Sequence, residues 1–305
     1  MTPAQLSRTV LQAVRRAAQD GELGEVRGGA RLAQRVTVES PPRRGTGDYA
    51  VSVAFGLAAA TGMAAYDVAK VLRARLERQD GIGSVEITGG GFLNVTLDDR
   101  ARAELVAELS RRHREDASPD ATTTGTPATG TPANDVPATD TPATTDTPAT
   151  DIARWSAVTG DTPAALAVRT AQASTLFRVQ YAHARTCALS RNARDLGFRG
   201  EPQAAAEAGD PTGGGSAYGP SGAALLALLA DHRRVSEQPD PARHARHLVA
   251  VGDAFFDFHD QCPPLPSGDE KPGAAHRARL ALVEATGTVL AGGLTQLGVS
   301  APAHL

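Results

Sequence analysis

Residue types that could do catalytic chemistry occur in this chain of 305 residues, but their spacing does not match a known site. His244 and His247 are three residues apart, yet no nearby cysteine or carboxylate completes a set of zinc ligands. Asp253 and Asp257 share one helical face beside His259, which is more typical of an exposed carboxylate pair than of an acid and base dyad. We therefore expect neither a metal site nor acid–base catalysis.

Phosphate-binding loops and activated nucleophiles are not indicated either. Gly89–Gly91 lies between two strand patterns, whereas a phosphate-binding loop needs Gly-Lys-Ser/Thr leading into a helix. Lys70 and Lys271 are the only lysines, and neither follows a glycine. Ser216 and Ser221 lie among glycines, but neither fits Gly-x-Ser-x-Gly. The sequence predicts no catalytic residues and no cofactor.

A different chemistry is indicated by the helical pattern near residue 180, where arginines alternate with planar side chains. Guanidinium groups bind phosphates and planar rings stack on unpaired bases, so the pattern is compatible with RNA binding. Taken alone, the residues favour the alternative in which Tyr181 is buried and the arginines form a solvated face. The residues concerned are Arg178, Tyr181, His183, Arg185, Arg191 and Arg194.

Residues 117–151 divide the chain. This segment repeats the unit Thr-Pro-Ala and contains no Leu, Ile, Phe or Met. Repeated prolines break helices, and the segment has nothing to bury, which predicts a disordered linker. Residues 1–116 and 152–305 are then two domains, each long enough to bury a core, held near each other without fixed geometry.

The first domain is predicted to be a small α+β domain with an antiparallel sheet and helices on one of its faces. A capping box at Thr2 and Gln5 begins the first helix, and Asp48 is expected to cap a second one. Strands and helices are then expected, in chain order, at 35–39 (strand), 49–60 (helix), 67–79 (helix), 84–88 and 92–97 (a hairpin), and 99–114 (helix).

The second domain is predicted to be an all-α bundle. A glycine-rich and proline-rich loop is expected at 197–222. Apolar residues recur at helical spacing in four segments: 163–196, 223–235, 241–259 and 274–297.

Charge and cysteine content limit which partners and which cellular compartment the sequence predicts. The net charge is −3, divided as +2 for the first domain, −5 for the linker and 0 for the second domain. Any nucleic-acid contact must therefore come from local patches. Cys187 and Cys262 are too few for a disulfide framework. No signal-peptide pattern and no apolar run of about 18 residues is present, so we expect a cytoplasmic protein with no membrane contact.

Two phrases in the first domain resemble the N-terminal additional domain of arginyl-tRNA synthetases. These are Gly47–Ala50 (Gly-Asp-Tyr-Ala) and Gly90–Asn94 (Gly-Gly-Phe-Leu-Asn), although Val51-Ser52 replaces Thr-Asn and Gly90 replaces proline. The resemblance implies contact with the D-loop corner of tRNA. The side chains it implicates are Arg43, Arg44, Asp48, Tyr49, Phe92 and Asn94, with core packing of Tyr49 and Phe92 as an equal alternative.

Three phrases in the second domain resemble the DALR-type anticodon-binding bundle of the same family. They are Gln180–Arg185, Ala254–His259 and the segment from Ala278 to Pro302. The family usually ends in Pro-Glu-Arg-Met, whereas Pro302–Leu305 reads Pro-Ala-His-Leu. The resemblance implies anticodon contact through Arg178, Tyr181, His183, Arg185, Arg191, Arg279 and His304.

Arginyl-tRNA synthetases carry their catalytic domain between these two modules, where this chain has the Thr/Pro/Ala segment. The His-x-Gly-His and Lys-Met-Ser-Lys-Ser motifs are also absent. The resemblance therefore implies a monomeric, non-catalytic protein that binds tRNA, with tRNA-Arg as the expected partner, through D-loop and anticodon contacts without charging it. The alternative is a protein-interaction module or an accessory factor for a synthetase, with RNA binding lost, which the near-neutral domains favour. An enzyme acting on arginyl-tRNA would need a catalytic site that the sequence does not offer.

Overall fold

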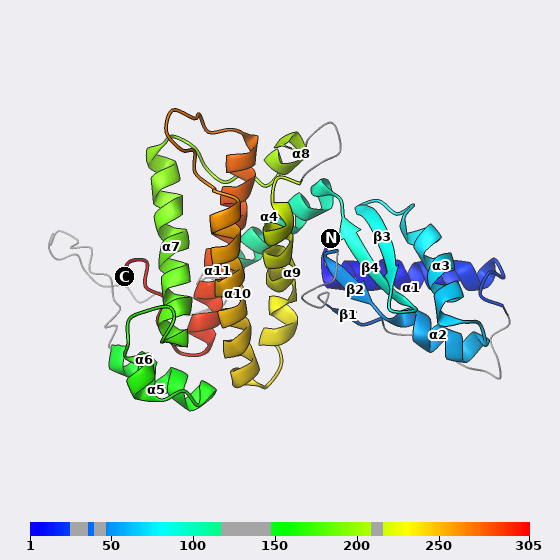
Figure 1. Cartoon of the computed structure of the whole chain (residues 1–305), viewed down its shortest axis with the longest axis horizontal. Coiled ribbons are helices and arrows are strands. Elements are labelled where there is room, and N and C mark those ends of the chain that lie inside the picture. The colour runs from blue at the N-terminus through cyan, green and yellow to red at the C-terminus, as the bar shows by residue number, and fades with distance from the viewer. Residues whose placement is uncertain (25–35, 40–46, 117–147, 209–215) are drawn as a thin grey trace, which may run out of the picture.

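The computed structural model describes residues 1–24, 36–39, 47–116, 148–208 and 216–305. It shows a small α+β domain beside a larger helical bundle, as the sequence predicts (Figure 1). Most of the expected linker, residues 117–147, lies outside the described residues.

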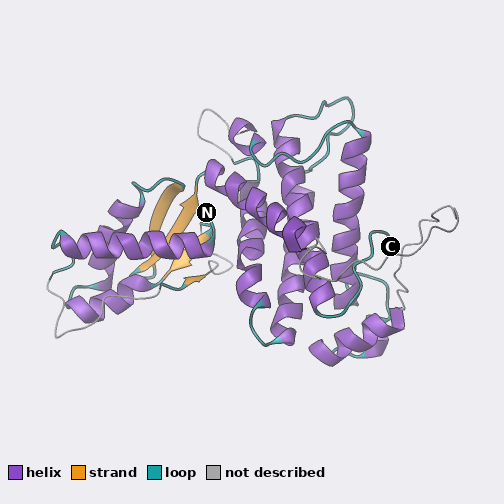
Figure 2. Ribbon diagram, turned by 180° about the vertical axis from the view of Figure 1, so that it is seen from behind, coloured by secondary structure: helices purple, strands orange, loops and turns teal. Residues whose placement is uncertain are grey.

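The α+β domain is built on a four-stranded antiparallel sheet with strand order β1-β2-β4-β3. Helix α1 crosses one face of the sheet (Figure 2) and packs against α3, which contacts β3 and β4. The elements are α1 (Pro3–Gln19), β1 (Val38–Glu39), β2 (Tyr49–Val51), α2 (Val53–Thr61), α3 (Ala65–Leu76), β3 (Ile82–Thr88) and β4 (Phe92–Leu97).

The start of α1 confirms the predicted capping box. The Thr2 hydroxyl accepts a hydrogen bond from the Gln5 amide at 3.3 Å, and the Gln5 side chain accepts one from the Thr2 amide at 2.6 Å. Leu6, Val10 and Val14 follow at four-residue spacing and are buried in the core of the domain. The cap thus sets the helix register that buries this apolar face.

Residues 49–51 form a strand, so the helix expected from residue 49 was wrong. Tyr49 and Val51 alternate inward and pair with β4, and the helix begins only at Val53. Gly47, at φ +98°, brings the chain so close that a Cβ would lie 3.0 Å from the Val95 carbonyl oxygen. Asp48 accordingly caps no helix; its carboxylate accepts a hydrogen bond from the Leu97 amide at 2.7 Å.

The second body is an all-α bundle, which confirms that prediction. Helix α11 packs against α7, α9 and α10 and also against the short helix α8. No helix in the described ranges is long and apolar enough to cross a membrane. The helices are α5 (Pro148–Thr159), α6 (Pro163–Leu166), α7 (Thr175–Asp195), α8 (Ala204–Ala208), α9 (Gly219–Ser236), α10 (Pro241–Gln261) and α11 (Ala274–Gln296).

The bundle differs from the expectation at two helix boundaries and in the loop expected at 197–222, which contains α8 and the first residues of α9. The helix expected over 163–196 is broken before Ser174, whose hydroxyl accepts from the Phe177 amide at 3.1 Å and donates to the Leu166 carbonyl at 3.0 Å. The residues at 148–151, expected in the linker, form the first turn of α5, and Asp151 is buried. Helix α5 also contributes Trp155, which is fully buried in the bundle core.

Helix α4 (Asp99–Asp116) packs differently from the expectation that it closes the first domain. It contacts α11, α8 and α9, and its side chains Ala103, Leu105 and Val106 belong to the core of the bundle. Only Ala101, in its first turn, belongs to the core of the α+β domain. The two bodies are therefore joined through a shared helix. This differs from the expectation that the two domains are held near each other without fixed geometry.

Three histidines meet inside the bundle, between α9 and α10. The ring of His232 lies 5.3 Å from that of His244 and 5.5 Å from that of His247, measured between centroids. One buried ring nitrogen of each histidine has no hydrogen-bond partner among the described residues. Burial lowers the pKa of His232 to about 3 and that of His247 to about 4, and it also lowers the pKa of His244.

This cluster predicts that the protein loses stability as the pH falls below neutrality. An unfolded histidine takes up a proton near pH 6.5 while folded His232 and His247 stay neutral, so each of these two costs about 1.4 kcal/mol per pH unit below 6.5 until its folded pKa is reached. His232→Leu should therefore reduce the loss of unfolding free energy between pH 7 and pH 5 by about 2 kcal/mol, measured by urea denaturation. His304→Ala is the matched control, since His304 is exposed. An unchanged pH dependence in His232→Leu would contradict the prediction.

Candidate nucleic-acid interface

Three aromatic rings form a partly exposed stack on the surface of the bundle. Tyr181 of α7 lies parallel to Phe177, one turn earlier, at 5.8 Å and 6°. Phe256 of α10 stacks on Tyr181 at 5.7 Å and 24°. The Tyr181 side chain is held by these neighbours and is still 41 % exposed. We call Phe177, Tyr181 and Phe256 the aromatic stack; an exposed ring held in this way can stack on an unpaired base.

Two arginines border the aromatic stack, and their guanidinium groups make different contacts. Arg178 donates to the Asp253 carboxylate at 3.2 Å and to the Ala171 carbonyl at 2.6 Å, so its charge is already compensated. The Arg169 guanidinium lies over the Phe177 ring, 6.0 Å from its centroid. Arg169 can therefore extend the stack with a planar cation.

Arg185 is half-buried one turn beyond Tyr181, and its contacts leave it free to meet a phosphate. Its Nη2 lies 3.3 Å from Nε2 of His259, and Nδ1 of His259 lies 3.2 Å from the Asp260 carboxylate. Because a guanidinium can only donate, Nε2 accepts, and the proton of a neutral His259 ring sits on Nδ1, facing Asp260. This chain of contacts orients Arg185 and leaves its positive charge in place.

The chain end from Gly298 to His304 is bound along α7. The Gln180 side chain donates to the Ser300 carbonyl at 3.1 Å, and His183 Nδ1 lies 3.0 Å from the Pro302 carbonyl oxygen. Asp151 accepts hydrogen bonds from the Ser300 amide at 3.0 Å, from the Ser300 hydroxyl and from Gln180 at 3.1 Å. Helices α5 and α7 thus fix this last segment beside the aromatic stack.

Three residues expected to contact RNA instead bind backbone carbonyl groups of other segments of the protein. His183 is buried under the last segment. Arg191 binds the Ala303 carbonyl at 3.3 Å and lies 3.3 Å from the exposed ring of His304. Arg279 donates to the carbonyls of Ala217 and Pro263 at 2.9 and 3.2 Å, which ties two loops to α11. Of the residues predicted in the bundle, Tyr181, Arg185 and His304 present the most available groups.

In the α+β domain, Phe92 at the end of the hairpin turn is 42 % exposed. Its ring packs edge-on against Phe55 of α2 at 4.9 Å, and Phe55 is 39 % exposed. Tyr66, at the start of α3, is also exposed and lies 4.6 Å from the Lys70 ammonium. We call Phe55 and Phe92 the hairpin pair; it offers a second, smaller surface for base stacking.

Three other residues predicted in this domain, Asp48, Tyr49 and Asn94, are buried and not available for RNA. Asp48 and Tyr49 are each 2 % exposed and Asn94 is 4 % exposed. The Tyr49 hydroxyl donates to the Met1 carbonyl at 3.1 Å, and burial raises the pKa of Tyr49 above its ordinary value. These three side chains build the domain. Arg43 and Arg44 lie outside the described residues.

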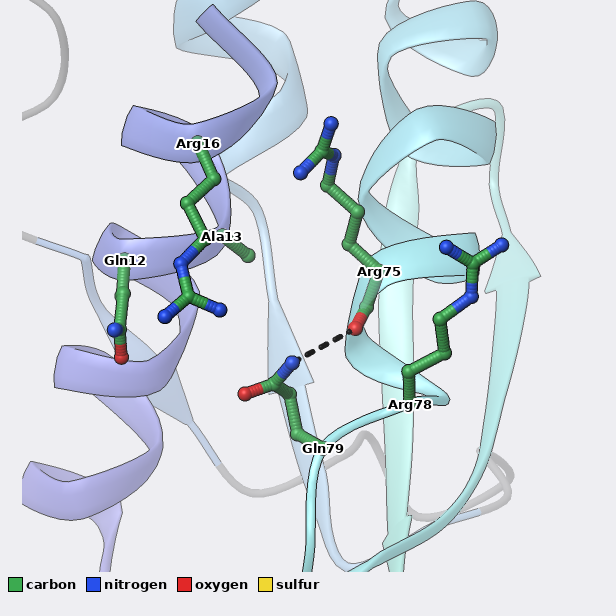
Figure 3. Close-up of a pocket in the computed structure, with 6 residues that line it drawn as sticks. All are labelled: Gln12, Ala13, Arg16, Arg75, Arg78 and Gln79. Carbon is green, nitrogen blue, oxygen red and sulfur yellow. Dashed lines mark hydrogen bonds between the residues drawn. The ribbon is translucent and has the colours of Figure 1, made fainter. Parts of the chain in front are cut away.

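A groove of about 270 Å³ between α1 and α3 is lined by arginine and glutamine side chains (Figure 3). Arg75 is paired with Asp20 at 2.5 Å and with Glu22 at 2.8 Å. Arg16 reaches into the groove from α1, facing Gln79 (Figure 3), and has no ion pair among the described residues. Because Arg16 is exposed, the groove suits contact with a surface phosphate better than enclosure of a small molecule.

Within the described ranges, no group of three or more histidine, cysteine, aspartate or glutamate side chains is arranged to hold a metal ion. Cys187 lies 3.6 Å from His183, but burial raises the pKa of its thiol, which disfavours a reactive thiolate.

The aromatic partners of Tyr181 were not predicted from the sequence. Phe177 has a detectable signal in the sequence, since it precedes Tyr181 by four residues and Arg185 follows Tyr181 by four. Phe256 becomes a partner of Tyr181 only because α10 packs against α7. In the same way, Phe55 becomes a partner of Phe92 only because a helix packs beside a strand. Such contacts carry no periodic signal in one segment.

Comparison with known proteins finds one family match in the α+β domain and another in the bundle. Residues 4–97 match the arginyl tRNA synthetase N terminal domain, and residues 179–305 match the DALR anticodon binding domain. The solved structure of Thermus thermophilus arginyl-tRNA synthetase is similar to 66 % of this chain, with 19 % sequence identity and a TM-score of 0.36. The match covers 32 % of that synthetase, so this chain corresponds to about a third of its length.

The attachment of the last segment can be tested by removing its buried anchor. Asp151→Ala leaves three donors without their acceptor, which should lower the free energy of unfolding by about 1–3 kcal/mol. Asp257→Ala, on the exposed face of α10, is the control and should change stability by less than about 0.5 kcal/mol. Urea denaturation measures both, and equal effects of the two substitutions would refute the anchoring role of Asp151.

Proposed function

From a chain that joins an arginyl tRNA synthetase N terminal domain to a DALR anticodon binding domain, we propose a protein that binds tRNA without charging it. The aromatic stack carries this proposal. Its central ring, Tyr181, lies in the segment matched to the anticodon-binding family, and it stays exposed although two aromatic neighbours could have enclosed it. Unpaired bases of an anticodon loop are the natural partners of such a ring.

The polar groups around the stack suit a single-stranded RNA loop. Arg185 supplies a charge for a phosphate, and Arg169 adds a planar cation beside Phe177. Asp253 and Asp257 on α10 keep the surface from being strongly basic. Stacking therefore contributes more to affinity here than bulk charge does, and tRNA-Arg is the proposed cognate RNA because both matched domains occur in arginyl-tRNA synthetases.

The absence of charging is supported by what separates the two matched segments. About eighty residues lie between them, and those that the structure describes form α4, α5 and α6, which pack in or on the bundle. A doubly wound nucleotide-binding sheet needs two βαβαβ halves, and one βαβ unit alone takes about 30 residues. The protein is proposed to act in the cytoplasm as a monomer, as a sensor, chaperone or accessory of tRNA.

A docking module for another protein is the competing proposal. The near-neutral charge of both domains and the exposed apolar rings would suit it. The two proposals differ in salt dependence, because phosphate contacts make RNA affinity fall as the salt concentration rises, whereas the affinity of an apolar protein interface changes little.

The aromatic stack predicts a graded effect of substitutions at Tyr181. Tyr181→Ala should weaken binding of tRNA-Arg by about tenfold or more, since stacking on one base contributes about 1–3 kcal/mol. Tyr181→Phe keeps the ring and is the matched control, with near-normal affinity expected. Filter binding at two salt concentrations, with a non-cognate tRNA in parallel, measures both. Equal affinity of Tyr181→Ala and the unmodified protein would contradict the role of the stack.

The lack of charging can be measured directly. Purified protein incubated with tRNA-Arg, arginine, ATP and magnesium should form no arginyl-tRNA above the level of a heat-inactivated sample. A synthetase of the family serves as the positive control. Arginyl-tRNA formed in proportion to the amount of this protein would refute the proposal.

A further inference from the structure

Helix α4 lies in the part of the chain that neither family match covers. The first match ends at residue 97 and the second begins at residue 179, while α4 runs from Asp99 to Asp116. It follows β4 with a single residue between them, Asp98, whose carboxylate accepts from the Ala101 amide at 2.7 Å and so caps the helix. The helix thus continues directly from the sheet into the bundle (Figure 1).

A buried ion pair locks this junction. Nη2 of Arg102 on α4 lies 2.9 Å from Oδ2 of Asp48, and its Nε lies 3.3 Å from Oδ1. The two side chains are 10 % and 3 % exposed. Arg102 also donates to Asp99 at 3.3 Å, and the Leu97 amide donates to Asp48 at 2.7 Å. A two-point pair this deeply buried holds α4 at one angle to the sheet.

Apolar packing acts in the same direction. Ala101 belongs to the core of the α+β domain, while Leu105 and Val106, one turn further, belong to the core of the bundle. Ala230 of α9 packs against both cores. One helix therefore has its first turn in one core and its following turns in the other, and the two cores cannot rotate independently without exposing one of them.

We propose that α4 fixes the hairpin pair and the aromatic stack on one rigid body, so that the partner is a single folded tRNA bound at two places. This rests on the proposed tRNA binding. Helix α2, which carries Phe55, and helix α7, which carries Tyr181, lie at opposite ends of the molecule (Figure 1). When the distance between the two surfaces is fixed, only an RNA whose two contact points are the same distance apart can bind both and gain affinity. An intact tRNA should therefore bind more tightly than an isolated anticodon stem-loop.

The first test cuts the chain without touching α4. A recognition sequence for a site-specific protease, inserted after Gly130, lets the purified protein be cleaved between α4 and α5. The two fragments should co-elute on size exclusion, because α4 is part of the bundle core, and tRNA affinity should stay within about twofold of the uncut protein. Separation of the fragments in native buffer would overturn the proposal.

The second test unlocks the junction. The unlocked variant combines Arg102→Ala with four glycines inserted between Leu97 and Asp98, which preserves the cap of α4. Its control combines Arg100→Ala, an exposed residue paired only with Glu104 on the same helix, with four glycines inserted after Gly130. Circular dichroism and thermal unfolding establish that both variants fold.

The expected result is that the unlocked variant binds intact tRNA about as weakly as Phe92→Ala does, while the control binds normally. All four proteins should bind an isolated anticodon stem-loop equally, because only the aromatic stack contacts it. Normal binding of intact tRNA by the unlocked variant would overturn the rigid two-point model and leave the proposed function standing. If the unmodified protein bound neither intact tRNA nor the anticodon stem-loop, the proposed function itself would be refuted.

Discussion

The buried pair between Asp48 and Arg102 is the contact on which the arrangement of this protein depends. It joins the loop before β2 to a helix whose later turns are part of the bundle core. Removing either partner would leave an uncompensated charge in a buried site, which costs about 3–5 kcal/mol in typical proteins. The requirement also explains why Asp48 faces inward, because its carboxylate accepts hydrogen bonds from the Leu97 amide and from Arg102.

The surface proposed to bind RNA depends on a second constraint: α7 packs against both the last segment of the chain and helix α10. One face holds the last segment of the chain through Gln180, His183 and Arg191. The adjoining face presents Tyr181 against Phe256 of α10. The buried Asp151 of α5 anchors the last segment through Ser300, while Phe177 and Phe256 position the Tyr181 ring, so one helix carries both sets of contacts.

The two folds and most helices could be predicted, because apolar periodicity and capping residues such as Thr2 are local signals. The strand at Tyr49 was misread as a helix because its pairing with β4 lies more than forty residues away. Asp151 was read as a linker charge because its acceptor role requires Ser300, which lies 149 residues further along the chain. Burial of His183 has the same origin. Residue type alone favoured a buried Tyr181 beside a solvated arginine face, and only the packing shows that Tyr181 is exposed while His183 is buried.

The central claim is that one tRNA molecule contacts both ends of a rigid protein. Hydroxyl-radical footprinting of tRNA-Arg in complex with the full chain tests it most directly, since it reports backbone protection at each nucleotide. If one tRNA spans both surfaces, two regions of the same molecule should be protected, one in the anticodon loop and one at the D-loop corner, and they should appear together as protein is added. Protection confined to one region at saturating protein, or two regions that appear at different protein concentrations, would contradict it.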